Sequence, residues 1–564
     1  AAGDVASGSG SEGEGAGGSQ GDDGDGQPPP VQIDLEGIAR RVVAFPVPEA
    51  RYSQVVGLGT KVLLYSTEVE GELTEPPFGE EYVPPGLLEA YDLTELEAKT
   101  LAEDVGPVTV SADRSTMAYR VRDRWRVLAA GAEPDKDAPD EPGRRSGWLD
   151  LGRVRVAIEP AAEWRQMLAE AWRLQRDQFW VADMSGVDWA GTFARYEPLA
   201  ARLATRSELS DLMWELQGEL GTSHAYEIGG DYRPTREWVM GHLGADLSRD
   251  RARRRWRIDH LVVGDSWDPE ATSPLTGPGI NVAVGDTVLA VNGQPVPPGA
   301  GPWPLLLHQG GQAVELTVGD PDGRHPRRVV VKALADDRPA RYREWVETNR
   351  ARVHRDSGDR LGYIHVPDMV STGFAEFHRS YLAELDREAL VVDVRFNRGG
   401  QVSGLLLQRL ARRRLGYDVS RWLPPEPYPP ESPTGPMVCL TNEHAGSDGD
   451  IFTHGFSMLG LGPVIGTRTW GGVIGIDDHL RLVDGTLTTQ PEFSFWFADV
   501  GFGIENHGAE PDVERDIAPH EAAAGQDPQL EAAIEAALAA ADAHHPPEPD
   551  LETRARLGPV RPPA

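Results

Sequence analysis

Ser447 is placed where a serine could act as a nucleophile. It lies in residues 443–450, a run of small and acidic residues that follows an apolar strand-like stretch and precedes an apolar helical one. A serine on a sharp strand-to-helix turn exposes its hydroxyl, and the backbone amides at the start of the helix can bind an oxyanion. The run is not the Gly-x-Ser-x-Gly elbow, and a serine that only caps the helix fits the same pattern.

A serine hydroxyl is a weak nucleophile, so this chemistry needs an adjacent base. His224 follows Ser223 in a turn just beyond a helical stretch. A histidine can act as the base if another group orients its second ring nitrogen. Glu505, between an aromatic strand and a glycine turn, is a candidate for that orienting role. A surface or capping histidine and a solvated carboxylate at a strand end fit these patterns too.

Lysine is the main alternative base for a serine nucleophile. The chain has lysine only at Lys61, Lys99, Lys136 and Lys332. None of them lies in the segment that carries Ser447, so a serine–lysine pair would need a lysine from an earlier position that no motif marks. The distribution of lysine therefore favours a histidine base.

Gly399 and Gly400 end an apolar, strand-like stretch that begins near residue 389. Glycines at the end of a buried strand let backbone amides approach a ligand oxygen. This pair therefore predicts a second source of oxyanion-binding amides, although a simple strand-to-helix turn fits the pattern equally well.

The sequence contains no motif for a bound cofactor or metal. It has no Gly-Lys-Ser/Thr of a P-loop, no Cys-x-x-Cys and no His-Glu-x-x-His, so we expect no cofactor and no protein-bound zinc. The net charge of −34 argues against nucleic acids and membrane surfaces as partners and favours cationic or neutral substrates. No apolar run reaches the roughly 18–20 residues that a membrane helix needs.

The single cysteine, Cys439, lies in an apolar run and is predicted to be a buried small side chain rather than a nucleophile. A chain without intrachain disulfides fits a reducing cytoplasm, although a secreted protein without disulfides is also consistent. The start of the chain shows no signal peptide and no initiator methionine, so we expect a fragment or a processed product.

Short apolar runs and turn residues indicate β-structure in two regions. Residues 31–150 resemble propeller blades, with Ser-x-Asp turns between strands, but two blades cannot close a propeller. In the second region, the tight turn Asn292-Gly293 joins two strands in a pattern that resembles a PDZ domain. PDZ domains bind extended peptides at a sheet edge; we favour a structural role here. Between the two regions, Ser207 is the predicted N-cap of a helix that leads to His224.

These elements predict a multidomain α+β protein, since 564 residues correspond to about three to five domains. The expected segments are a disordered acidic, Gly-rich tail or linker (1–30), a β-rich segment (31–150), a mainly helical segment (151–240), a PDZ-like domain (241–335), an α/β segment carrying Ser447 and Glu505 (336–545) and a disordered tail (546–564).

Four stretches in this order resemble the C-terminal half of the tricorn proteases, which are related to C-terminal-processing serine peptidases. The similarity runs from about residue 161 to residue 541. The matching stretches are residues 221–226, 395–400, 445–450 and 505–508. The resemblance implies a crotonase/ClpP-like catalytic segment, and it implies that the β-rich segment corresponds to the last blades of a second propeller.

The resemblance also implies a role for each matching residue. Ser447 would be the nucleophile and His224 its base, with Ser223 and Glu505 completing a tetrad. The amides of Gly400 and Asp448 would form the oxyanion hole, and Gly399 would contact substrate. Asp418 would face the P1 side chain and favour lysine or arginine there, although a solvated helix-end aspartate fits its short motif as well.

The function implied is a cytoplasmic serine peptidase that cleaves oligopeptides downstream of larger proteases such as the proteasome. Tricorn-like enzymes assemble as homohexamers, and aminopeptidases could process the products. Two other functions remain open from the sequence: a catalytically inactive scaffold that binds peptides through its PDZ-like and propeller-like modules, and an esterase or amidase for small molecules.

Overall fold

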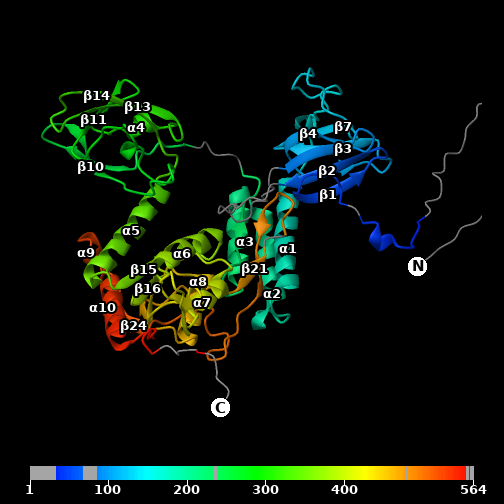
Figure 1. The fold of residues 1–564 in the computed structure, drawn as a ribbon. Helices are drawn as coiled ribbons and strands as arrows, with labels where there is room; N and C mark the ends of the chain where they lie inside the picture. Colours follow the sequence, from blue (N-terminus) through cyan, green and yellow to red (C-terminus); the bar gives the residue numbers. More distant parts are fainter. Residues whose placement is uncertain are drawn as a thin grey trace, which may run out of the picture. The chain divides into compact units, whose positions relative to one another are not determined.

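The computed structural model describes residues 33–42, 44–67, 86–232, 238–477, 480–553 and 558. The tail predicted over residues 1–30 lies outside these residues, as does part of the segment 546–564. The chain divides into two compact units: among the described residues, the first contains those up to Asp150 and the second those from Leu151 onward. Mixed helices and strands confirm the multidomain α+β class (Figure 1).

The first unit is one antiparallel sheet with the order β1-β2-β3-β4-β6-β5, in which β7 pairs with β6. Leu63, Leu88 and Tyr119 are among the fully buried side chains of its core. The β-rich prediction for this segment is therefore confirmed, whereas its assignment to a propeller stays a prediction. The strands are β1 (Arg51–Gly57), β2 (Lys61–Thr67), β3 (Gly86–Asp92), β4 (Glu97–Val105), β5 (Thr109–Val110), β6 (Thr116–Val121) and β7 (Arg124–Ala129).

The second unit begins with a helical layer formed by α1 (Pro160–Gln178), α2 (Trp189–Tyr196) and α3 (Arg206–Gly218). Met167, Met213 and Leu216 are fully buried between these helices. The prediction that Ser207 caps α3 is wrong. Thr205 is the N-cap, and it forms a capping box with Glu208, because each side chain bonds the backbone amide of the other residue.

A small antiparallel sheet follows, with the order β14-β13-β11-β10-β9 and with β12 paired to β11. The predicted Asn292-Gly293 turn joins β11 to β12, and both residues have positive φ values of 49° and 75°, as a tight hairpin turn requires. The elements are β9 (Ala245–Asp250), β10 (Arg255–Leu261), β11 (Thr287–Val291), β12 (Gln294–Pro295), α4 (Trp303–Leu306), β13 (Ala313–Gly319) and β14 (Arg327–Lys332).

The last part of the second unit contains a parallel sheet with the order β15-β16-β19-β20-β24. Helices cover both of its faces (Figure 1). One core cluster joins the sheet to α6, α7 and α8, and another joins it to α5 and α10. The strands are β15 (Leu361–His365), β16 (Ala389–Asp393), β19 (Met437–Thr441), β20 (Val464–Gly466) and β24 (Val513–Glu514), and the helices are α5 (Arg338–Ser357), α6 (Ser371–Glu384), α7 (Ser403–Leu410), α8 (Asp448–Met458) and α10 (Pro528–Ala543).

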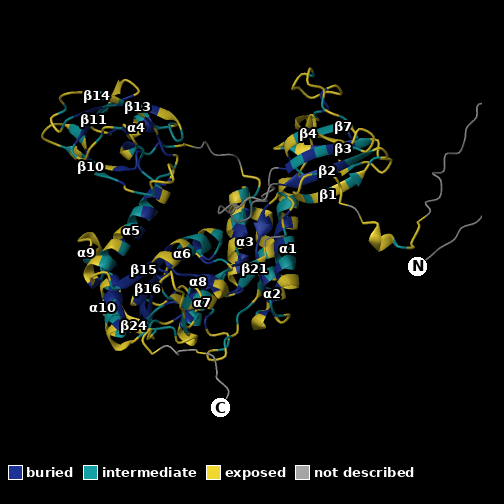
Figure 2. Ribbon diagram, viewed as in Figure 1, coloured by how far each residue is buried: buried dark blue, intermediate teal, exposed yellow. Residues whose placement is uncertain are grey.

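Every residue of β15, β16 and β19 is buried, as Figure 2 shows for the first two. Strands covered on both faces read as continuous apolar runs rather than as alternating patterns, which is why they were recognisable in the sequence. Cys439 lies in β19 with no exposed surface, and burial raises the pKa of its thiol. The prediction of a buried, unreactive cysteine is confirmed.

Short strands connect the helical layer to the parallel-sheet part. β8 (Glu227–Ile228) pairs with β22 (Leu487–Thr488). The side-chain amide of Gln175 in α1 also donates to the carbonyl of Thr489 at 2.8 Å. Residues separated by more than 250 positions are therefore fixed to one another, which is the condition for an active site shared between the two segments.

A buried ion-pair network holds α10 to the sheet. Arg395, which is only 1% exposed, contacts Asp393 at 2.7 Å and Asp527, the N-cap of α10, at 2.9 Å. The hydroxyl of Tyr363 donates to Asp393 at 2.8 Å. Because Gly399 and Gly400 follow Arg395 closely, this network fixes the start of the glycine turn.

Arg395→Ala should lower the free energy of unfolding of this part by about 3–5 kcal/mol, because Asp393 would remain buried without its partner. The matched control, Arg324→Ala, removes an exposed ion pair and should cost less than about 1 kcal/mol. Hydrogen exchange of the β16 and α10 amides measures both changes. Equal protection in the two variants would contradict the stabilising role of Arg395.

Candidate active site

Ser447 occupies a strained turn between β19 and α8. Its backbone has φ 56° and ψ −121°, a conformation that L-residues rarely adopt and that clusters at functional sites. Ser447 is the N-cap residue of α8, yet its side chain makes no capping hydrogen bond. The reading of this serine as a simple side-chain cap therefore does not hold, and its hydroxyl is available at the start of the helix.

His224 lies on the loop after α3, also with a positive φ of 63°. Its side chain is largely buried, and Nδ1 lies 2.7 Å from the Ser223 hydroxyl. The Ser223 hydroxyl in turn donates to Oε2 of Glu505 at 3.1 Å. A hydroxyl has one hydrogen to donate, so Ser223 accepts from the histidine, Nδ1 carries the proton and Nε2 keeps its lone pair.

Glu505 joins the loop of His224 to the second catalytic segment. Its Oε1 accepts from the Ser223 amide at 2.6 Å and from the Thr222 hydroxyl at 3.0 Å. Its Oε2 accepts from the amides of Val473 and Ile474 at 2.7 and 3.1 Å, in addition to the Ser223 hydroxyl. Five donors from two distant segments converge on one carboxylate, so this side chain fixes the position of the histidine loop.

Burial lowers the pKa of His224, and the negative charge of Glu505 opposes this shift. Burial is the larger cause, because desolvation disfavours the imidazolium form. The ring is therefore neutral at neutral pH and can accept a proton.

The glycine turn approaches Ser447 closely. A Cβ atom on Gly399 would lie 2.5 Å from Cβ of Ser447, and one on Gly400 would lie 2.1 Å from the Met369 carbonyl oxygen. The Gly399 amide donates to the Asn397 side chain at 2.9 Å. Among the described residues, the amides of Gly400 and Asp448 have no acceptor, so both can donate to an oxyanion beside Ser447.

The side chain of Asp448 is directed to the other side of the turn. Its carboxylate accepts from the Ser403 amide at 2.9 Å and also bonds the Ser403 hydroxyl. This contact ties the start of α8 to the start of α7 and orients the Asp448 amide. Burial raises the pKa of this carboxyl group.

Ser447, His224, Gly399, Gly400 and Asp448 line one cavity of about 1350 Å³. Over the described residues, no hydrogen bond joins the Ser447 hydroxyl to the His224 ring. Catalytic hydrogen bonds are often long without substrate and shorten when it binds. The cavity can hold an extended chain of several residues.

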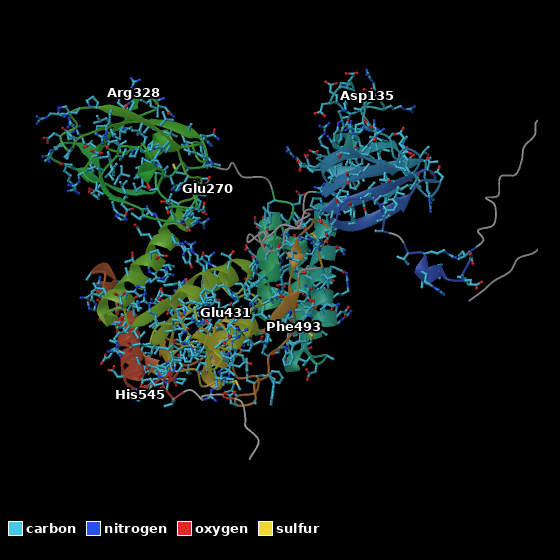
Figure 3. The ribbon with its side chains drawn as sticks, viewed as in Figure 1. Asp135, Glu270, Arg328, Glu431, Phe493 and His545 are labelled. Carbon is cyan, nitrogen blue, oxygen red and sulfur yellow. The ribbon has the colours of Figure 1, made fainter. Side chains whose placement is uncertain are left out.

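The cavity also contains residues that the sequence reasoning missed. Trp470 and Tyr226 flank His224, with ring centroids 5.5 and 5.4 Å from the imidazole. Phe493, at the end of β23 (Gln490–Phe493) and labelled in Figure 3, lines the cavity with two further phenylalanines. The alternating pattern of residues 493–497 was the available signal, since every second residue there is phenylalanine.

Carboxylates outnumber guanidinium groups in the cavity. The acidic lining residues are Asp368, Glu443, Asp448 and Asp477, and Arg398 is the arginine among the lining residues. Asp418, the predicted P1 contact, is exposed in β17 (Gly416–Asp418) and does not line the cavity of its own chain. The structure thus brings seven of the eight predicted residues together and leaves Asp418 apart.

The described part of the chain shows neither a metal site nor a membrane-spanning helix. No cluster of three or more His, Cys, Asp or Glu side chains is arranged to hold a metal ion there. Nor does any helix in that part combine the length and the apolar character needed to cross a membrane.

Glu505→Gln should lower kcat/KM about a hundredfold. The glutamine side chain would turn an N–H toward groups that themselves donate to Glu505, so some of these hydrogen bonds would be lost. The variant loses the charge but keeps the shape of the side chain. Glu510→Gln, at an exposed carboxylate, is the matched control and should leave activity unchanged. Steady-state kinetics on a short peptide amide tests both, and similar kcat/KM values would contradict the role of Glu505.

Comparisons with known proteins agree over most of the chain. Family models match as the tricorn protease C1 domain (residues 160–218), the tricorn protease PDZ domain (241–336) and peptidase family S41 (360–515). Tricorn protease homolog 1 of Streptomyces coelicolor is 48% identical over 515 residues, which cover 91% of this chain and 48% of that protein. The tricorn protease homolog of Saccharolobus solfataricus is 43% identical over 505 residues, or 89% of this chain and 46% of that protein.

A solved structure agrees with these relatives. The crystal structure of the tricorn protease superposes with a TM-score of 0.80 at 36% identity, over 88% of this chain and 47% of that one. The chain spans about half the length of the relatives it matches. With the C1, PDZ and S41 domains present in order, the chain belongs to the tricorn protease family.

Proposed function

We propose that this chain carries the active site of a tricorn-type serine peptidase that hydrolyses oligopeptides. The observation that carries the proposal is the relay from Glu505 through Ser223 to His224, which ends in the same cavity as Ser447. The relay places the proton on Nδ1 and leaves Nε2 as the base.

In the proposed mechanism, Oγ of Ser447 attacks the peptide carbonyl carbon while Nε2 of His224 takes its proton. The amides of Gly400 and Asp448 donate to the oxyanion that forms. His224 then gives the proton to the leaving amine, and an acyl-enzyme remains on Ser447. Water attacks this ester with His224 again as the base, which releases the acid and restores the hydroxyl.

Ser447→Ala and His224→Ala should each lower the rate of peptide hydrolysis by about a thousandfold or more. Removing either the nucleophile or its base costs about as much as removing both. A fluorophosphonate probe should label Ser447 in the wild-type chain and in the control His520→Ala, whose histidine is exposed. It should label neither catalytic variant at a comparable rate.

Absence of labelling in a folded wild-type chain would contradict the peptidase proposal and favour an inactive peptide-binding scaffold. Faster cleavage of simple esters than of tripeptide amides, with no amide cleavage, would favour an esterase. Both measurements use the same protein preparation, so a difference between them cannot arise from misfolded protein.

A preference for arginine or lysine at P1 is part of the proposal. The cavity has an excess of carboxylates, and a cationic side chain gains most where such groups are partly desolvated. Because Asp418 is exposed and lies outside the cavity of its own chain, its predicted contact with P1 requires a second copy of the chain.

The surroundings of Asp418 suit such a contact. Exposed apolar side chains gather along the β17–β18 hairpin, where β18 is Glu426–Tyr428. Contiguous exposed apolar surface is typical of interaction sites, and most homo-oligomers bury such patches between copies. The exposed side chains are Leu415, Val419, Trp422, Leu423 and Tyr428.

Asp418→Asn should therefore lower the ratio of kcat/KM for arginine over leucine at P1 about tenfold. Mixing Asp418→Asn chains with Ser447→Ala chains should restore arginine cleavage, because an intact Asp418 then meets an intact Ser447 across the interface. Asp477→Asn is the comparison, since Asp477 lines the cavity of its own chain. Loss of the preference in Asp477→Asn alone would contradict the contribution of a second copy.

The family relationship supports further proposals about the whole protein. We propose that it forms a homohexamer in the cytoplasm and acts downstream of larger proteases, and that aminopeptidases process its products. The same holds for a structural rather than peptide-binding role of the PDZ domain.

A further inference from the structure

A second carboxylate lies behind the nucleophile and has no part in the mechanism above. Asp450 has no exposed surface and is the third residue of α8, whose N-cap is Ser447. From this position an acidic side chain can reach back to the amide of the N-cap residue. The nearby Ser447 amide helps to lower the pKa of Asp450, but Oδ2 of Asp450 is buried without a hydrogen-bond partner. The carboxylate thus lies in the first turn of the helix that begins at the nucleophile.

The same carboxylate holds the loop formed by residues 469–474. The Gly471 amide donates to Oδ1 of Asp450 at 2.8 Å, and the Thr469 side chain and the Gly472 amide also act on it. Trp470 lies between these donors. Its ring approaches the His224 ring at 5.5 Å, and a Cβ atom on Gly446 would lie 2.8 Å from it.

The far side of this loop is connected to the histidine. The Gly471 carbonyl accepts from the Asn506 amide at 2.7 Å, and the Asn506 side chain donates to the Gly221 carbonyl at 2.7 Å. Glu505 accepts from two further amides of the loop. Loop 469–474 therefore donates to two carboxylates, with Asp450 in the first turn of α8 and Glu505 bonded to the loop of the base.

We propose that Asp450 is a positioning residue, whose ionised carboxylate holds loop 469–474 to the first turn of α8 and so sets the approach of Ser447 to His224. The proposal rests on the peptidase function proposed above. The Gly471 amide donates to a charged acceptor only while Asp450 is ionised, and a charge-assisted hydrogen bond is roughly twice as strong as a neutral one.

Proton uptake by Asp450 falls within an accessible pH range. Burial is the largest cause of its shift and raises the pKa to about 6, against the hydrogen bonds that lower it. None of the charged groups on the surrounding elements is among the causes of this shift. These groups are Asp448 and His454 of α8, Arg468 before the loop, and Glu505 and His507 beyond it.

Protonation of Asp450 is expected to change activity and stability in opposite directions. As the pH falls through about 6, Asp450 takes up a proton and its hold on the loop weakens, so activity falls. A pKa raised in the folded state means that this group adds stability at low pH, which is lost as the pH rises through about 6. Loss of activity through protonation of Asp450 is therefore not caused by unfolding, because the same protonation stabilises the folded state.

The pH profile of kcat/KM tests the proposal, measured from about pH 8 down to about pH 5. His224 and Asp450 must both lose a proton, so the logarithmic slope of the wild type should approach two on the acid side. Asp450→Asn cannot titrate, and its slope should be one, with kcat about ten- to a hundredfold lower at pH 8. The control Asp516→Asn, at an exposed carboxylate, should keep the wild-type rate and slope. An acid limb with the same slope and midpoint in the wild type and in Asp450→Asn would overturn the proposal.

Trp470 gives a second measurement that does not need activity. The fluorescence of the wild type minus that of Trp470→Phe isolates one of the 15 tryptophans, and its emission should change with a midpoint near pH 6. The same difference measured in the Asp450→Asn background should not change there. Emission independent of pH in the wild type would overturn the role of Asp450. A change in Trp470 emission near pH 6, without fluorophosphonate labelling of Ser447, would instead count against the peptidase function.

Discussion

The convergence of five donors on Glu505 is the constraint on which the site depends. The donors come from the loop before His224 and from loop 469–474, which are about 250 residues apart in sequence. A carboxylate is suited to this task because it accepts on two oxygens without offering a competing donor. Hydrogen bonds to a charged group contribute about 1.5–3 kcal/mol each, so the set can hold a loop that has no sheet ladder of its own. The tautomer of His224 follows from it, since Ser223 must donate to Glu505.

The parallel sheet supplies the rigid side of the cavity. β16 and β19 end beside one another, and the glycine turn and the Ser447 turn follow them. Arg395 holds the first of these turns to α10, and Asn397 uses its side chain to accept the Gly399 amide. The Gly400 amide is thereby left for a ligand. Packing on both faces of the sheet fixes the oxyanion donors, whereas the base is brought to them by Glu505 from outside the sheet.

Much of this site could be predicted because its signals are local. The buried strands read as apolar runs, the Ser447 turn separates a strand from a helix, and Ser223 stands next to His224 in the sequence. The capping box of α3 was equally local, since Thr205 and Glu208 are three residues apart, but the prediction chose Ser207, which lies between them. Trp470 and Asp477 gave no local signal, and Asp450 lies in the recognised run 443–450 without a role that the run reveals, because these residues act on segments that only tertiary folding brings near. Asp418 shows the same limit: its short motif carried no information about which cavity it faces.

Strain at both reacting residues explains why carboxylates support the segments around them. Ser447 and His224 each have positive φ, and such conformations in residues other than glycine cost about 1–3 kcal/mol each. They persist only where the surroundings fix them. Glu505 fixes the loop of His224 with charge-assisted hydrogen bonds, and Asp450, in the first turn of α8, accepts from the Gly471 amide. Since both carboxylates accept from amides of loop 469–474, a displacement at either one would move the serine and the histidine relative to each other. The geometry of the pair is therefore a property of the loop between them as much as of the two residues themselves.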